Sequence, residues 1–380
     1  MSISKKQYIF IRATALLSGT IIGAGILAIP YAVYEAGYWL GILYIIILGI
    51  VMMFLHLMLG EISLRTRGFL DVPELIHKYL GKKGHLIALG SLFIIIYGAL
   101  TAYIRAAGDI ISSVTVLPSY TGSMIFFIIG GYLALRGLKV VSKWELVFGI
   151  GMILIIVTLW LKALSINGID WTQFQLVPFR SLSASFSPYG VILFAYSGLI
   201  AIPYIKKLLG KQVVYMKSVI KLGFLIPLFL YSLFVTLVIG VSGVDITPVA
   251  TVSLGQKLGG QALVIINIFA LLAISTSFIM LGRSLIESYM SLGKIHRHTA
   301  TIATFLPPMG LVLVNGASFN SVLNYAGGIG VSILSILIVL TFWRSKRIGK
   351  IPPAYSLGHV KWVGIIMITM FFIGMVSLFF

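Results

Sequence analysis

The chain has 380 residues, of which 59% are hydrophobic and 10% are charged, and its formal net charge is +19. A soluble domain keeps about a quarter of its residues charged, so this composition excludes a soluble protein and indicates one that lies in a bilayer. The chain contains no cysteine, which excludes disulfide bonds and thiolate metal sites.

Eleven apolar segments follow one another along the chain, and we predict that each is a membrane-spanning helix. Each has about 18 to 27 residues, the length that a helix needs to cross about 30 Å of hydrocarbon. None alternates between apolar and polar residues as a transmembrane β-strand does. The predicted spans begin near Ile11, Leu40, Leu86, Thr121, Lys143, Phe186, Ser218, Gln261, Thr299, Asn320 and Lys361. The fold class is therefore an all-α polytopic membrane protein.

The basic residues are distributed unevenly between the two sides of this predicted topology. If the N-terminus is cytoplasmic, 24 of the 28 Lys and Arg residues fall on inner segments. Three fall on outer segments (Lys162, Arg180 and Lys257), and Arg105 falls within a span. The positive-inside rule then predicts a cytoplasmic N-terminus and an outer C-terminus. The positive charge reflects topology and attraction to anionic lipid, so we do not expect a nucleic-acid partner.

One heptapeptide occurs twice in nearly the same form. The segment Gly25–Tyr31 reads GILAIPY, and Gly198–Tyr204 reads GLIAIPY. Five predicted spans separate the two copies, which is an odd number, so the copies run in opposite directions across the membrane. Two inverted five-span repeats with one extra helix are typical of secondary transporters. We place the repeats at about residues 8–165 and 183–345 and the extra helix at about 360–380, all within a single domain, 1–380.

A second echo supports the same period. VPELIHKYLGKKG (Val72–Gly84) follows span two, and TPVATVSLGQKLGG (Thr247–Gly260) follows span seven. Asp71 precedes the first copy and Glu74 stands three residues later, a spacing that predicts a capping box at the start of a short interfacial helix.

Proline interrupts both copies of the heptapeptide. Because proline has no N–H, Pro30 deprives the Ile26 carbonyl of its helical donor, and Pro203 does the same to Leu199. We expect both helices to break near the bilayer midplane, where free backbone groups are tolerated only beside a cavity. Exposed N–H groups suit a carboxylate and exposed carbonyls suit an ammonium group, so paired breaks predict a site for an α-amino acid. The alternative is a pair of proline kinks with packing glycines.

Three segments resemble a known family. IGAGILAIPYA in span one, YGALTAYIRAAG in span three and LNYAGGIGVSIL in span ten are similar to the hydroxy/aromatic amino acid permeases, LeuT-fold carriers of the amino acid–polyamine–organocation superfamily. Span six departs from the family pattern, since FAYSGLIAIPY has Ser-Gly in place of a longer polar break.

The resemblance implies a set of substrate-binding residues. Backbone amides of the first break would hold the carboxylate, and the second break would offer carbonyls to the ammonium group and ring surface to the side chain. Two residues on span three would line the pocket, although any single tyrosine can equally be a packing residue. The implied residues are Thr20, Gly23, Ala24, Gly25, Tyr97, Thr101, Phe194, Ala195, Tyr196 and Ser197.

The resemblance also implies a coupling cation. In LeuT-fold carriers, span eight supplies side-chain ligands that face carbonyls of span one. The corresponding residues are Ser275, Thr276, Ser277, Gly19 and Ile22, and hard cations take oxygen ligands of this kind. These hydroxyls can instead bond to their own helix. Proton coupling is the rival, and it normally needs a titratable group deep in the membrane.

Few titratable groups lie in the predicted spans. His56 and Glu61 lie on span two, and Glu61 can pair with Arg65 four residues later or bond to the broken backbone of span six. Arg105 and Asp109 are four residues apart on span three, and with Glu35 they could form an outer gate.

These features together favour a plasma-membrane amino-acid importer. We find no catalytic motif that would indicate an enzyme, and no ligand pattern for a transition-metal carrier. A channel, a receptor and a carrier of another small solute stay open as alternatives. The prediction is Na⁺- or H⁺-coupled symport of a hydrophobic or aromatic amino acid by alternating access, with the lipid bilayer as partner and no other cofactor.

Overall fold

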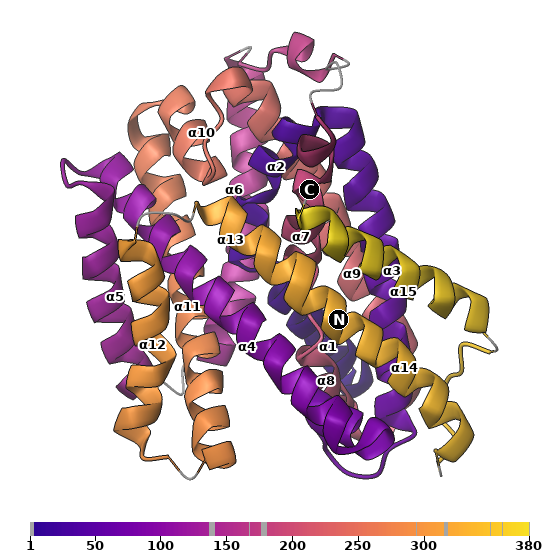
Figure 1. Cartoon of the computed structure of the whole chain (residues 1–380). Coiled ribbons are helices and arrows are strands. Elements are labelled where there is room, and N and C mark those ends of the chain that lie inside the picture. The colour runs from indigo at the N-terminus through magenta and orange to yellow at the C-terminus, as the bar shows by residue number, and fades with distance from the viewer. Residues whose placement is uncertain are drawn as a thin grey trace.

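The computed structural model describes residues 4–136, 141–166, 168–175, 181–293, 295–314, 318–349, 351–358 and 360–379. Within these ranges the chain forms helices and no strand, which confirms the predicted all-α class (Figure 1). The α-helices are α1 (Lys5–Ile21), α2 (Ile29–Ala36), α3 (Tyr38–Leu64), α4 (Val72–Val114), α5 (Ser119–Arg136), α6 (Val141–Ser165), α7 (Leu182–Ala195), α8 (Ala201–Leu209), α9 (Met216–Ser242), α10 (Ala250–Leu258), α11 (Gly260–Gly293), α12 (Arg297–Leu313), α13 (Phe319–Tyr325), α14 (Ser332–Ile348) and α15 (Lys361–Val376).

Short helical turns join several of these helices. Most are 3₁₀ turns, and η5 is a π-helical turn that joins α13 to α14 within one long rod. These turns are η1 (Ala24–Leu27), η2 (Trp171–Phe174), η3 (Gly210–Tyr215), η4 (Gly243–Asp245), η5 (Ala326–Val331) and η6 (Ser377–Phe379).

Six helices in the described ranges are long and apolar enough to cross a membrane, or seven if α1 and η1–α2 form one bent span. Three further apolar helices are shorter: Ser119–Leu135, Gly151–Ser165 and Ala184–Ala195. Each of the eleven predicted starts falls within a helix, but length and apolarity alone do not establish eleven spans. The eleven-span arrangement remains a prediction.

Two short helices precede long ones, as the second sequence echo suggests. Asp71 accepts a hydrogen bond from the Glu74 amide at 2.8 Å, and the Glu74 carboxylate accepts one from the Asp71 amide at 2.9 Å, which confirms the predicted capping box. Gly81 adopts φ 76°, a conformation that favours glycine, and divides α4 into a short first part and a long second part. In the same way, α10 ends at Gly259 with φ 64° before α11 begins.

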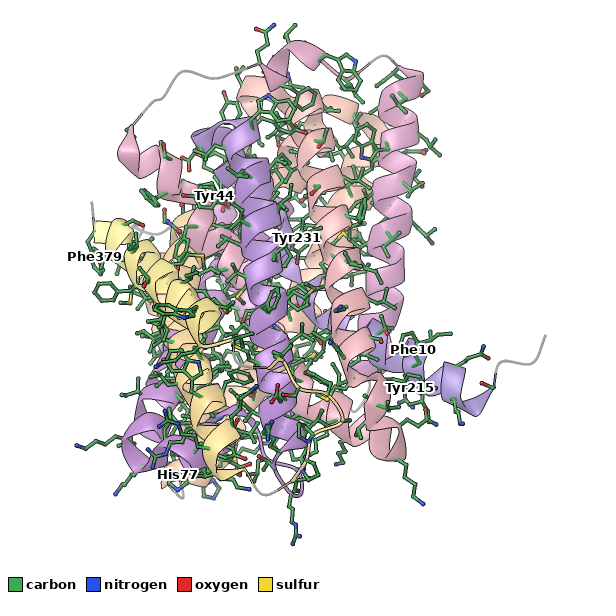
Figure 2. The ribbon with its side chains drawn as sticks, turned by 90° about the vertical axis from the view of Figure 1, so that its right-hand side faces the viewer. Phe10, Tyr44, His77, Tyr215, Tyr231 and Phe379 are labelled. Carbon is green, nitrogen blue, oxygen red and sulfur yellow. The ribbon has the colours of Figure 1, made fainter. Side chains whose placement is uncertain are left out.

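The heptapeptide segments lie in the core of the helix bundle. Helix α4 crosses the molecule obliquely and packs against α5, α11 and α14 (Figure 1). Helix α1 packs against α8 and α9, and α2 packs against α7, so the N-terminal segment and the segment near residue 200 lie side by side. In Figure 2, His77, Phe10 and Tyr215 lie in the lower half of the molecule, and Tyr44 and Phe379 lie in the upper half.

Candidate functional site

The first heptapeptide follows a break in the helix. Helix α1 ends at Ile21, Ile22 has ψ 63°, and Gly23 is extended with φ −97° and ψ −162°. The two halves, Lys6–Ile21 and Ala24–Ala36, meet at 44°. Pro30 lies in the first turn of α2, where its missing N–H leaves no helical bond unmade. The backbone thus leaves the helix at Ile22–Gly23, and the proline lies at the start of α2, after the η1 turn of the second half.

The second heptapeptide contains the matching break. Helix α7 ends at Ala195, and α8 begins at Ala201 with Pro203 in its first turn. Between them the Ser197 amide donates to the Phe194 carbonyl at 3.0 Å, in a turn that does not continue the helix. The two breaks are therefore of the same kind, a helix end followed by a proline-initiated helix.

The prolines do not leave the predicted carbonyls without a donor. The Leu199 carbonyl accepts from the Ile202 amide at 3.2 Å, and the Ile26 carbonyl accepts from the Ala28 amide. Both carbonyls thus lack the donor four residues later that a regular helix supplies, and an amide nearer in the chain takes its place. The backbone groups that lose their helical partners belong to the ends of α1 and α7 and to the beginning of η1.

The two breaks contact each other directly. A Cβ atom added to Gly25 would lie 2.9 Å from the Ala195 Cα and 3.2 Å from its Cβ. A Cβ atom added to Gly198 would lie 2.7 Å from the Ile21 Cγ1. A side chain at Gly25 would push the two backbones apart, whereas one at Gly198 would displace the Ile21 side chain. The structure thus brings together the two segments that the repeat singled out.

Tyr231 on α9 connects the two breaks. Its buried hydroxyl lies 2.7 Å from the carbonyl of Ile21, the last residue of α1, and 2.9 Å from the carbonyl of Ala195, the last residue of α7. Figure 2 shows Tyr231 within the bundle, beside α3. Sequence reasoning missed this residue because nothing in the apolar run of span seven sets it apart from a packing tyrosine.

Two more buried tyrosines surround this point. The Tyr196 ring centroid lies 5.1 Å from that of Tyr231, and its hydroxyl donates to the Ile45 carbonyl at 3.2 Å. Tyr103 on α4 is also buried, and its hydroxyl faces Ser277 on α11. An added Cβ on Gly23 would lie 3.7 Å from the Ser277 Oγ. Ser277 on α11 thus lies beside the first break.

Other hydroxyls of the predicted set donate to their own helices. Thr20 donates to the Leu16 carbonyl at 2.7 Å, Ser275 to that of Leu271 at 2.7 Å, and Thr276 to that of Ala273 at 3.0 Å. Thr101 is fully buried and donates to the Tyr97 carbonyl at 2.8 Å. The protons of these hydroxyls are used in hydrogen bonds to backbone carbonyls, but the oxygen atoms can still accept a hydrogen bond or bind a cation.

Tyr97 faces away from the breaks. Its hydroxyl donates to the Ala303 carbonyl on α12 at 2.7 Å and also contacts the Tyr289 hydroxyl on α11. The structure does not bring it to the predicted pocket. Four other residues of the predicted set lie at or next to the breaks. Gly19 is half-buried, and Ile22, Ala24 and Phe194 are buried.

The predicted outer gate is divided between two places. Arg105 and Asp109 lie 3.6 Å apart on α4, and Asp109 accepts a hydrogen bond from Ser119. Glu35 instead accepts from the Ser187 hydroxyl of α7 at 2.6 Å. Among the described residues, Glu35 forms no ion pair with Arg105, so the three do not form one network.

Glu61 lies in a buried charge cluster at the end of α3. Its carboxylate accepts from the Arg65 guanidinium at 2.8 Å and lies 3.6 Å from the Lys346 ammonium of α14. It also accepts from the Leu357 amide at 2.7 Å and the Ser356 hydroxyl at 3.2 Å. The expected Arg65 pair is present, and the backbone that Glu61 binds belongs to the α14–α15 connection, where the family pattern implied span six.

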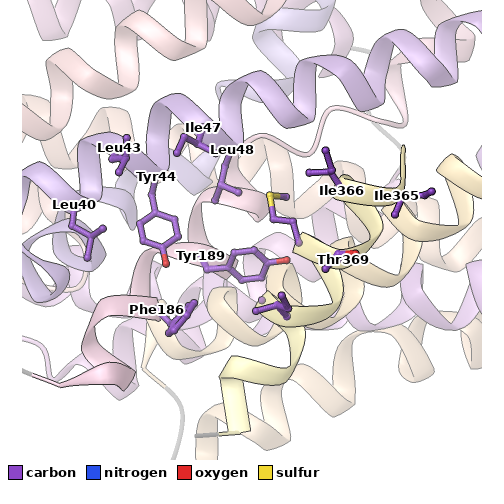
Figure 3. A pocket seen from close by; sticks show the side chains of 13 residues that line it. Leu40, Leu43, Tyr44, Ile47, Leu48, Phe186, Tyr189, Ile365, Ile366 and Thr369 are labelled. Carbon is purple, nitrogen blue, oxygen red and sulfur yellow. The ribbon is translucent and has the colours of Figure 1, made fainter. Parts of the chain in front are cut away.

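An apolar cavity of about 600 Å³ lies beside α3, α7 and α15, away from the breaks. Figure 3 shows Tyr44 of α3, Tyr189 of α7 and Thr369 of α15 on its walls. The Tyr189 hydroxyl contacts Ser332 and the Phe371 carbonyl, so this cavity offers few free polar groups to a charged ligand.

The chain is similar to proteins of known family. Residues 6–377 match the model of the tryptophan/tyrosine permease family. The chain is 26% identical over 361 residues to the tyrosine-specific transport system 1 of Haemophilus influenzae, with 88% of each chain covered. It is 25% identical to the glutamine transporter 2 of Aliivibrio fischeri, covering 87% of this chain and 88% of that one. It is also 26% identical to a tryptophan-specific transport protein of Haemophilus influenzae, covering 97% and 96%.

Proposed function

Because the chain belongs to the tryptophan/tyrosine permease family, we propose that it is a cation-coupled symporter of an aromatic or hydrophobic amino acid. Its membership of this family and its similarity to transport proteins identify it as a multi-pass membrane transport protein and not an enzyme. The relatives named for tyrosine and tryptophan favour an aromatic side chain. The glutamine transporter shows that relatives at the same level of identity also differ in substrate.

The proposed architecture is a LeuT-type arrangement of two inverted five-helix repeats with α15 added. Helices α1–η1–α2 would form span one and α7–α8 span six, and the described helices supply a segment for each of the eleven predicted spans. The N-terminus would be cytoplasmic and the C-terminus outside, in the plasma membrane or the inner membrane of a cell with two. The bundle of spans one, two, six and seven would rock against the rest to alternate access.

The observation that carries this proposal is the direct contact between the two breaks. The contact of Gly25 with Ala195 places the beginning of one helix half beside the end of another. The amides of Ala24 and Gly25, at the beginning of η1, would hold the substrate carboxylate, because helix N-termini present free N–H groups. The Gly23 amide beside them donates to the Ile21 carbonyl at 2.8 Å. The carbonyl end of α7 would face the ammonium group, and Tyr196 and Phe194 would supply apolar ring surface.

The coupling ion would be Na⁺ or H⁺. Ser277 lies beside the first break and its hydroxyl oxygen can serve a sodium ion together with carbonyls of Gly19 and Ile22. Ser277→Ala tests this role directly. If sodium is bound there, uptake by the variant loses its stimulation by a sodium gradient; if wild-type uptake is the same in sodium and choline, sodium coupling is contradicted and a proton gradient is tested next.

Substrate binding and exchange test the function itself. Purified protein is screened against the twenty amino acids by thermal melting, with and without sodium, and the hits are tested for counterflow in proteoliposomes. We expect an aromatic amino acid to raise the melting temperature and to exchange with its labelled form. Failure of every amino acid in both salts contradicts the substrate class, and ion current without saturable exchange indicates a channel.

A further inference from the structure

The hydroxyl of Tyr231 lies where the carbonyl ends of two helices converge. Ile21 is the last residue of α1 and Ala195 is the last residue of α7, and both carbonyls lie within 3 Å of this one oxygen, at 2.7 and 2.9 Å. The last carbonyls of a helix have no helical donor and carry its partial negative charge. Two negative helix ends therefore meet at one buried point of the core.

This point has fewer hydrogen-bond donors than acceptors. A tyrosine hydroxyl has one proton, so it donates to one of the two carbonyls at a time. The Ile21 carbonyl also accepts from the Gly23 amide at 2.8 Å, whereas the hydroxyl is the donor that the structure places on the Ala195 carbonyl. Tyr231 itself is fully buried, so the hydroxyl has little access to bulk water. Each carbonyl oxygen still has a second lone pair, so this negative point can accept further N–H donors from a positively charged group.

An α-amino group can supply such donors. An ammonium group donates three hydrogen bonds, and three oxygens are present here: two carbonyls and the hydroxyl. The chain reaches from the carbonyl end of α1 to the amide end of η1 through two residues, Ile22 and Gly23. The ammonium and carboxylate groups of an α-amino acid are joined through one carbon atom, so this short separation suits both ends of the same ligand.

We propose that Tyr231 is a specificity-determining residue of the substrate site. Its hydroxyl oxygen is the third ligand of the substrate's ammonium group, beside the Ile21 and Ala195 carbonyls. In the empty protein its proton is shared between these carbonyls. On binding, the hydroxyl keeps its bond to the Ala195 carbonyl while its oxygen accepts from one N–H of the ammonium group. This inference rests on the proposed amino-acid transport and adds to it a residue of span seven.

The test compares ligands that differ in one group. The probes are L-tyrosine and L-tryptophan, their desamino acids 3-(4-hydroxyphenyl)propionate and 3-indolepropionate, and the amines tyramine and tryptamine. Affinities are measured by displacement of a labelled amino acid from purified full-length protein. For Tyr231→Phe we expect the dissociation constants of the amino acid and the amine to rise at least tenfold. Those of the desamino acid should stay within twofold.

Tyr189→Phe is the matched control. Tyr189 is also buried, and its hydroxyl also makes two contacts, to Ser332 at 2.8 Å and to the Phe371 carbonyl at 3.3 Å, but these lie away from the breaks. Both variants lose one hydroxyl at constant ring volume. Comparable melting temperatures then separate a loss of recognition from a loss of folding.

Several outcomes would overturn the inference. Equal weakening of all three ligand classes indicates a structural role, and unchanged or tighter binding of the amino acid contradicts a ligand role. Stabilisation of the wild type by sodium alone, lost in Tyr231→Phe, assigns the point to a metal ion. If neither analogue binds measurably, the dissociation constant of the amino acid alone is compared between the two variants. A tenfold rise in Tyr231→Phe but not in Tyr189→Phe supports the role. If the wild-type protein binds no amino acid, the proposed transport function is refuted, and this outcome differs from a failure of the Tyr231 inference alone.

Discussion

Gly25→Ala is the substitution that most directly probes the contact between the breaks. The added Cβ would lie 2.9 Å from the Ala195 Cα, 3.2 Å from its Cβ and 3.4 Å from the Phe194 Cδ1. The first of these contacts is with backbone, which cannot rotate away as a long side chain can. The two breaks must therefore separate, or one of them must change conformation.

The size of the effect follows from this overpacking. Inserting a methyl group into a well-packed core typically costs about 1–3 kcal/mol. If the cost falls on the substrate-bound state, it weakens binding by roughly five- to 150-fold, because about 1.4 kcal/mol corresponds to a factor of ten. If it falls on the folded protein as a whole, the melting temperature decreases. We expect at least one of these losses, together with reduced uptake.

Gly90→Ala serves as the control for Gly25→Ala. Gly90 lies within α4, and nothing lies within 4 Å of an added Cβ there. Alanine is favoured over glycine in a helix interior by about 1 kcal/mol, so this variant should be as stable as the wild type or more so. Both variants are measured by thermal melting, equilibrium binding and proteoliposome uptake. A Gly25→Ala protein that matches Gly90→Ala in all three measurements would refute the close contact between the breaks.

Three further predictions concern polar groups. Glu61→Gln removes a buried carboxylate from two partly exposed cations, Arg65 and Lys346. Since breaking a fully buried ion pair costs about 3–5 kcal/mol and partial exposure reduces that cost, the melting temperature should drop; an unchanged melting curve would show that the cluster is not stabilising. The Asn320 side-chain amide donates to the Ala28 carbonyl at 2.8 Å, and the Ala32 amide donates to the same carbonyl at 3.4 Å. Asn320→Ala removes the shorter of these bonds, so a destabilisation of about 1 kcal/mol is expected in chemical denaturation, against no change if the longer bond is sufficient. Hydrogen bonds from nearby Gln173 and Thr172 lower the pKa of Asp170, in the loop after α6. Its stabilising contribution is therefore full above the ordinary pKa of about 3.9 and is lost as the pH falls through the lowered value. Melting curves of Asp170→Asn should accordingly depend less on pH between about 5 and 3, and an identical pH dependence would contradict this.

The sequence predicts the helices and the breaks because both depend on local rules. Long apolar runs need helices in a bilayer, and the Asp71–Glu74 spacing fixes a helix start through its own backbone. The prolines locate both breaks within a few residues. They do not locate them exactly, since Pro30 lies in the first turn of α2 and Pro203 in the first turn of α8, and the backbone leaves the helix upstream of each.

The rest of the site depends on contacts between distant parts of the chain. Tyr231 is 210 residues from Ile21 and 36 from Ala195, and its role exists only because α9 packs against both breaks. Tyr97 shows the same dependence on packing, because its sequence position is compatible with the pocket while its hydroxyl contacts Ala303 and Tyr289. Periodicity assigns a residue to a helix, but the packing of helices decides where its polar atom points.

The central claim is that an amino acid is bound between the breaks of the two interrupted helices. An experimental structure of the protein with its transported amino acid tests this most directly. We predict ligand density between Gly23–Gly25 and Phe194–Ser197, with the carboxylate at the amides of η1 and the ammonium group near Tyr231. Density in the cavity between α3, α7 and α15 (Figure 3), with the two breaks still in contact, would contradict the claim.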